Sequence, residues 1–162
     1  MKIVTMCRGG NVRSVAAKMI LSRCLRHEVI AIGADNTNYD TKRFLFNWAD
    51  RIVIMHPDLL KYVSFTYFDN YGGRPRLDYT YKTTLLNVGN DVWGNPFNEN
   101  LQTTIVSLIN SNVYSPLFDE KEGIIDLAEV IKTLREYKAK LELRNIRFDI
   151  DKQIIKREDA YE

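Results

Sequence analysis

The fold is set by the first stretch of the chain, MKIVTMCRGGNVRS (residues 1–14). Residues 1–6 form a short apolar run with β-branched members, which predicts a buried strand. The run stops at Gly9 and Gly10, and apolar residues then recur at three- and four-residue spacing over 12–26, which predicts a helix. A strand that passes through a glycine turn into a helix is typical of the opening of an α/β domain.

The same alternation continues along the chain. Further strands are predicted at residues 29–34, 51–55 and 83–88, and further helices at 41–50, 96–110 and 124–143, with a short helix opened by Pro57. This order predicts a three-layer α/β/α domain with a four-stranded parallel sheet, because parallel strands need helical crossovers.

Two segments fall outside this alternation. Residues 62–82 are rich in aromatic side chains and predict an insertion, either a hairpin or a mobile lid. Residues 145–162 are charge-dense with interspersed isoleucines, which predicts a docking strand or a frayed tail. We therefore expect one domain over residues 1–162, with a core at 1–112 and a helical extension at 113–162 that packs on the domain or on a partner.

The composition excludes several classes of protein. A chain of 162 residues is long enough for a real core without a metal or disulfide. Its two cysteines, Cys7 and Cys24, and its two histidines, His27 and His56, lack the spacing of metal ligands, so we expect neither metal nor cofactor. No apolar run is long enough for a membrane span or a signal peptide, which predicts a cytoplasmic protein without membrane contact. The net charge of +2 does not indicate a nucleic-acid partner.

The turn after the first strand has the form of an anion cradle. Glycines at a strand-to-helix turn let backbone N–H groups converge on one anion, at the positive end of the helix. Cys7 lies at the mouth of this positive field, where the thiolate is favoured over the thiol. Arg13 can bring its planar fork to two phosphoryl oxygens, and Ser14 can donate its hydroxyl to the sulfur. The residues expected around the phosphate are Arg8, Gly9, Gly10, Asn11 and Val12.

A cysteine, five residues and Arg-Ser directly after the first strand resemble the low-molecular-weight protein tyrosine phosphatases. The resemblance implies hydrolysis of phosphomonoesters, above all phosphotyrosine, through a phosphocysteine. In that scheme Cys7 attacks phosphorus, Arg13 and the loop amides hold the equatorial oxygens, and a distant aspartate protonates the leaving group. The implied partners are a phosphorylated protein or a small phosphomonoester, with phosphate ion as product.

The family places its aspartate in a loop after the fourth strand, as Asp-Pro followed by aromatic residues. The corresponding stretch here is NDVWGNPF (residues 90–97), in which proline does not follow the aspartate directly. By this resemblance Asp91 is the candidate acid, favoured over Asp69 or Asp78, and Trp93 is the candidate wall of the pocket. Tyr39, after the second strand, is a further candidate for the pocket lining.

The loop also departs from the family pattern. Gly10 occupies the place of the asparagine that braces the family's loop, and Asn11 follows it. Val12 stands where many members have a second cysteine that protects the nucleophile as a disulfide. Cys24 falls on the apolar stripe of the first helix and is expected in the core. An arsenate reductase is therefore disfavoured, because it needs further cysteines.

Other functions stay open at this point. The loop could grip a phosphoryl group without hydrolysis, or the enzyme could act on nucleotides or RNA 5′ ends, which we favour less. His56 follows the third strand at the edge where ligands gather in open α/β sheets, although a surface histidine is the simpler interpretation.

Overall fold

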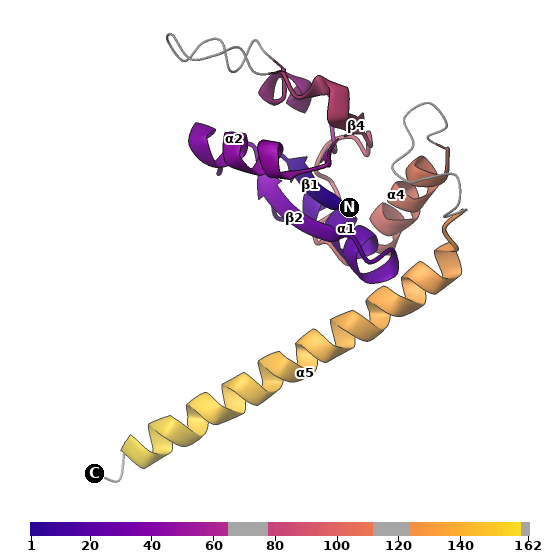
Figure 1. The fold of residues 1–162 in the computed structure, drawn as a ribbon. Helices are drawn as coiled ribbons and strands as arrows, with labels where there is room; N and C mark the ends of the chain where they lie inside the picture. Colours follow the sequence, from indigo (N-terminus) through magenta and orange to yellow (C-terminus); the bar gives the residue numbers. More distant parts are fainter. Residues whose placement is uncertain (65–77, 112–123, 160–162) are drawn as a thin grey trace.

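The computed structural model describes residues 1–64, 78–111 and 124–159, with side chains of the last helix as far as Asn145 (Figure 1). Most of the predicted aromatic insertion lies outside these ranges, so neither the hairpin nor the lid is tested. Figure 1 shows helices on both sides of the strands and one long helix, α5, that leaves the body of the domain.

Four parallel strands form the sheet, in the order β2-β1-β3-β4. They are β1 (Lys2–Cys7), β2 (Glu28–Gly33), β3 (Arg51–Ile54) and β4 (Thr83–Leu85). The four-stranded parallel sheet predicted from the sequence is confirmed. β4 is shorter than predicted, although the N–H groups of Leu86 and Val88 still donate to the carbonyls of Ile54 and Met55 beyond its end.

The two faces of the sheet carry separate cores. Along β1, Ile3 and Cys7 point to one face, and Val4 and Met6 point to the other, because side chains alternate along a strand. All four are at most 3% exposed. A strand buried on both sides needs a helical layer on each face, which explains the three-layer arrangement.

The helices complete these layers. The first face is covered by α1 (Arg13–Met19), which continues as the π-helical turn η1 (Ile20–Cys24), by α4 (Glu99–Ser111) and by the start of α5 (Leu127–Asp159). The second face is covered by α2 (Tyr39–Trp48) and the 3₁₀ helix η2 (Pro57–Tyr62), and a second 3₁₀ turn, η3 (Thr80–Lys82), leads into β4. The predicted helix over 12–26 is therefore α1 joined to a π-helical turn.

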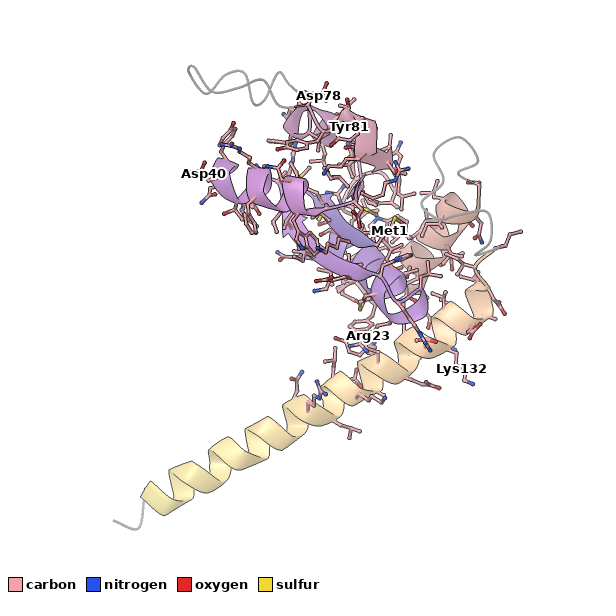
Figure 2. The ribbon with its side chains drawn as sticks, viewed as in Figure 1. Met1, Arg23, Asp40, Asp78, Tyr81 and Lys132 are labelled. Carbon is pink, nitrogen blue, oxygen red and sulfur yellow. The ribbon has the colours of Figure 1, made fainter. Side chains whose placement is uncertain are left out.

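Helix α5 begins on the domain and extends beyond it. Val130 and Leu134 are each 1% exposed in the first core. Tyr137 packs on Phe97, and the guanidinium carbon of Arg23 lies 3.3 Å from the centroid of the Tyr137 ring. Figure 2 shows Arg23 beside α5. No helix within the described ranges has the length and apolar character that a membrane crossing requires.

The end of the chain corrects the sequence-based expectation. Residues 145–162 were expected as a docking strand or a frayed tail, but α5 remains helical to Asp159. The predicted helix over 124–143 is the first half of this longer helix. Strand pairing would need a free sheet edge beside this segment, whereas a helix satisfies its own backbone as it runs out from the body (Figure 1).

Candidate active site

Cys7 is the last residue of β1 and lies at the carboxyl edge of the sheet. We call the segment that begins there the Cys7 loop (residues 7–14). The carbonyl of Cys7 accepts the N–H of Ala34 at 2.8 Å, and the carbonyl of Arg8 accepts the N–H of Asp35 at 3.0 Å. These bonds continue the pairing of β1 with β2 past the ends of both strands. The start of the loop is thereby fixed to the segment after β2.

Glycines allow this close approach of two backbones. Gly10 has a φ of +73°, in the left-handed region that favours glycine. A Cβ at Gly10 would lie 2.5 Å from the nitrogen of Gly33. In the other direction, a Cβ at Gly33 would lie 2.6 Å from the carbonyl carbon of Gly9. Side chains at these positions would push the Cys7 loop away from β2.

The sulfur of Cys7 lies at the centre of a small hydrogen-bond network. It accepts the N–H of Gly10 at 3.1 Å and lies 3.1 Å from Oγ of Ser14. Ser14 is 0% exposed, and its carbonyl accepts a hydrogen bond from Oγ1 of Thr5 at 2.8 Å. Hydrogen bonds donated to sulfur stabilise the thiolate, which is the nucleophilic form of cysteine.

Arg13 closes the loop with a buried guanidinium. Its side chain is 6% exposed, and Nη1 donates to the carbonyl of Gly89 at 2.7 Å. Nε is buried and has no hydrogen-bond partner among the described residues. Gly89 itself has a φ of +75°, and its N–H donates to Oδ1 of Asn87. This contact ties the loop after β4 to the Cys7 loop.

Asn36 braces the Cys7 loop from the outside. Its Nδ2 donates to the carbonyl of Gly9 at 2.8 Å. Asn11, the residue next to the position where the resembling family has its bracing asparagine, is exposed. Nε of Arg8 lies 3.8 Å from a carboxylate oxygen of Asp35, with both side chains more than half exposed. The brace therefore comes from the segment after β2.

A cavity of about 280 Å³ opens beside the Cys7 loop. Its lining combines two arginines from the loop with two aspartates, a histidine, an asparagine and a leucine from other elements: Arg8, Arg13, His56, Asp58, Leu59, Asn90 and Asp91. The sulfur of Cys7 is not part of this lining, whereas Arg8 and Arg13, which follow it in the same loop, are. The cavity is thus rich in charge of both signs.

His56 and Asp58 reach the cavity from the end of β3. Met55 donates its N–H to the carbonyl of Met6, so His56 lies beside the start of the Cys7 loop. Nδ1 of His56 accepts the N–H of Asp58 at 3.1 Å and caps η2. Oδ2 of Asp58 lies 3.5 Å from the same nitrogen. Since Nδ1 is an acceptor here, the neutral ring carries its proton on Nε2.

The structure brings together some of the candidate residues and separates others. Asp91 is exposed and lines the cavity with both loop arginines. Trp93 is half-buried against the first core, with Nε1 unpartnered among the described residues, and does not line the cavity. Tyr39 is 6% exposed in the second core, also outside the lining. Val12, within the Cys7 loop, packs on the first core.

The second cysteine has a different environment. Cys24 is half-buried in η1 and packs on the first core. Burial raises the pKa of the Cys24 thiol, and the negative charge of Glu129 raises it further. This cysteine is therefore held in its less reactive thiol form.

Sequence reasoning did not identify Asn36 or Asp58 as residues of the site, and it favoured a surface histidine as the interpretation of His56. Asn36 follows Gly33 in a turn where asparagine is common, so nothing marks its contact with Gly9. His56 does carry a signal, since it follows a strand at the carboxyl edge of a parallel sheet. The same argument extends to Asp58, because Pro57 at the start of a short helix keeps it next to that edge.

Comparisons with known proteins add little to this site. No family model matches the chain, and no curated protein matches its sequence. Among solved structures, the chain is similar to the YwlE arginine phosphatase from Geobacillus stearothermophilus, with a TM-score of 0.43 and 14% identity, over 88% of this chain and 96% of that one. Such a likeness is too weak to indicate a function, which must come from the chain's own residues.

Proposed function

We propose that this chain is a cysteine-dependent phosphomonoesterase that acts through a phosphocysteine intermediate. The observation that carries the proposal is the buried guanidinium of Arg13, with an unpartnered Nε, in the same loop as the hydrogen-bonded sulfur of Cys7. No carboxylate of the described residues lies within ion-pair distance of Arg13. A buried cation needs a counter-charge, and a phosphoryl dianion would supply it.

The orientation of Arg13 supports a bidentate contact. Nη1 is engaged by the carbonyl of Gly89, which leaves the edge formed by Nε and Nη2 for a ligand. Two parallel N–H donors on that edge match two oxygens of a phosphoryl group. The Gly89 contact fixes the rotation of the guanidinium and so lowers the entropy that binding would cost.

In the first step the thiolate of Cys7 attacks phosphorus. A sulfur–phosphorus bond forms, the bond from phosphorus to the ester oxygen breaks, and the leaving oxygen receives a proton. The donors around the loop hold the equatorial oxygens, whose charge grows in the transition state. The products are a phosphocysteine and the free alcohol or phenol.

In the second step water attacks the phosphocysteine. The water gives a proton to the carboxylate that served as the acid, a phosphorus–oxygen bond forms, and the sulfur leaves as a thiolate. The hydroxyl of Ser14, 3.1 Å from the sulfur, stabilises that thiolate. Phosphate is released, and the enzyme returns to its starting protonation state.

Asp91 is the acid that we propose for both proton transfers. It lies two residues after Gly89, whose carbonyl is bound to Arg13, and it lines the cavity beside that arginine. We expect Asp91→Asn to slow poor leaving groups by about 10²- to 10⁴-fold. The rate on an activated ester such as p-nitrophenyl phosphate should fall far less, because its phenolate leaves without a proton. Equal losses on both kinds of ester would contradict this role.

Phosphotyrosine is the substrate that we propose, since the spacing of Cys7, Arg13 and Ser14 resembles that of tyrosine phosphatases. Trp93 and Tyr39, the candidates for the wall of the pocket, lie outside the lining of the cavity beside the Cys7 loop. Rates on a phosphotyrosine peptide, a nucleoside monophosphate and an RNA with a 5′ phosphate, measured side by side as phosphate release, test the choice of substrate class.

The deciding experiment replaces the nucleophile. Cys7→Ser should lower turnover of an aryl phosphate by at least about a thousandfold while binding of inorganic phosphate is retained. Cys24→Ser is the matched control and should keep its turnover, because Cys24 lies in η1 on the first core. Phosphate binding without turnover in the parent protein would instead favour a phosphoryl-binding module, and undiminished turnover in Cys7→Ser would exclude the mechanism.

A further inference from the structure

The cavity beside the Cys7 loop holds two carboxylates where one is enough for the chemistry. Asp58 enters from η2, after β3, and Asp91 enters from the loop after β4. Each step of the proposed reaction moves one proton, to or from a single oxygen on the side of phosphorus opposite the sulfur. One carboxyl group can serve both steps, so the other one has no part in the proton transfers.

The second carboxylate is not compensated by a firm ion pair within the chain. Asp58 is 69% exposed, and its partner within ion-pair distance is Nδ1 of His56, 3.5 Å away. That nitrogen already accepts the N–H of Asp58 itself, which is the arrangement of a neutral ring. Arg8 also lines the cavity, but its Nε lies 3.8 Å from the carboxylate of Asp35, and no ion pair joins it to Asp58 among the described residues. The negative charge of Asp58 therefore faces the cavity.

Arg13 shows independently where the phosphoryl group belongs. Its side chain is more than nine-tenths buried, it lines the same cavity, and its Nε has no partner among the described residues. A substrate with its phosphoryl group on Arg13 would direct its leaving group into the rest of the cavity, toward the carboxylates. The cavity is thus positive at the Cys7 loop and negative on the walls that come from β3 and β4.

We propose that the site selects phosphomonoesters whose leaving group carries a positive charge, such as an amine, and that Asp58 is the residue that recognises it. The inference rests on the proposed phosphomonoesterase function and adds the substrate class. A cationic leaving group is attracted by Asp58, whereas an anionic one is repelled by it. Because the carboxylate is exposed, we expect a preference of about fivefold, at the upper end for an exposed ion pair.

Three aryl phosphates with similar phenols test the proposal: the phosphate esters of tyramine, p-cresol and 3-(4-hydroxyphenyl)propionate. Their leaving groups carry a positive, a zero and a negative charge at neutral pH. We expect kcat/KM to fall in that order, by about fivefold at each step. The differences should shrink as salt rises from about 0.01 M to about 1 M, where the screening length falls from about 30 Å to about 3 Å.

Asp58→Asn is the deciding variant. It keeps the size of the side chain and removes the charge, so the three kcat/KM values should come within about twofold of one another. Asp40→Asn is the matched control. It removes the same charge from the first turn of α2, outside the cavity lining, and should keep the full preference. A preference that survives Asp58→Asn unchanged, or equal values in the parent protein, would overturn the inference and leave the phosphatase proposal standing.

Binding separates this inference from the proposed function. The Kd values of the same three phosphates for Cys7→Ser, measured by calorimetry, should follow the same order as kcat/KM. If the parent protein turns over none of them, the phosphatase proposal fails, and the order of the Kd values still decides the charge selection. Equal Kd values would refute it.

Discussion

Replacing Gly33 with alanine should disable the site while the domain stays folded. Gly33 is the last residue of β2, and the added Cβ would lie 2.6 Å from the carbonyl carbon of Gly9 and 2.8 Å from the nitrogen of Gly10. All of its nearest contacts are backbone atoms of the Cys7 loop, which cannot rotate away as a flexible side chain can. The strain therefore falls on the loop that holds the sulfur and the N–H of Gly10.

The size of the effect follows from these distances. To reach an ordinary contact of 3.4 Å, the Cys7 loop and β2 must separate by about 0.8 Å. A displacement of about 1 Å at a catalytic group costs about a hundredfold in rate, so kcat/KM should fall by one to two orders of magnitude. The free energy of unfolding should fall by about 1–3 kcal/mol, as for other overpacked sites.

The assay is hydrolysis of p-nitrophenyl phosphate, with urea denaturation run in parallel. Gly94→Asn is the matched control, because Gly94 has a φ of +83° that asparagine tolerates and open space where a Cβ would stand. It should change kcat/KM by less than about twofold. A Gly33→Ala protein with the activity of its parent would refute the argument that this backbone contact positions the Cys7 loop.

Three further predictions concern single contacts. Asn36→Ala removes the hydrogen bond to Gly9, so the free energy of unfolding in urea should fall by about 0.5–1.5 kcal/mol and kcat/KM should fall with it. Asn11→Ala should leave the free energy of unfolding unchanged, and an equal loss in both variants would contradict the bracing role of Asn36. The hydrogen bond from Arg135 on α5, followed by its charge, lowers the pKa of Glu99 on α4. This pair stabilises the fold above the pKa of the unfolded carboxyl and loses its effect as pH falls through the lower folded pKa. The Tm difference between Arg135→Ala and its parent should therefore shrink as pH falls below the ordinary carboxyl pKa, and a constant difference would contradict it. Burial and Glu129 raise the pKa of Cys24, so its alkylation by iodoacetamide should stay slow at pH 8 and quicken in Glu129→Gln; rapid alkylation in the parent would show an open thiol.

Local patterns predicted the frame of the molecule. The alternation of buried residues along β1 and the glycine turn after it indicated a strand, a turn and a helix, and the structure has them in that order. The spacing from Cys7 to Arg13 and Ser14 likewise predicted a nucleophilic cysteine beside an arginine that binds a phosphoryl group. These features lie within one stretch of chain, where sequence distance limits spatial distance.

Contacts between distant segments were not predictable in the same way. The brace from Asn36 to Gly9 and the bond from Arg13 to Gly89 depend on how the segments after β2 and β4 fold over the Cys7 loop. No local pattern encodes them. Trp93 is a further case, since the sequence does not show that its side chain packs on the first core.

The end of α5 was predicted wrongly because the spacing of its apolar residues is also typical of a strand. Ile146, Phe148 and Ile150 alternate with charged residues at a period of two, which favours a strand. The helix nonetheless continues, because once nucleated on the domain each added residue gains a backbone hydrogen bond at little cost. Length and an anchored start outweighed local periodicity.

The long helix also offers a practical handle. With 33 residues at about 1.5 Å each, α5 spans about 50 Å, and its far end lies well away from the sheet (Figure 1). A biotin attached there would tether the protein to a sensor surface and keep that surface away from the Cys7 loop. Phosphate esters could then be screened on immobilised protein with the cavity still open to solvent.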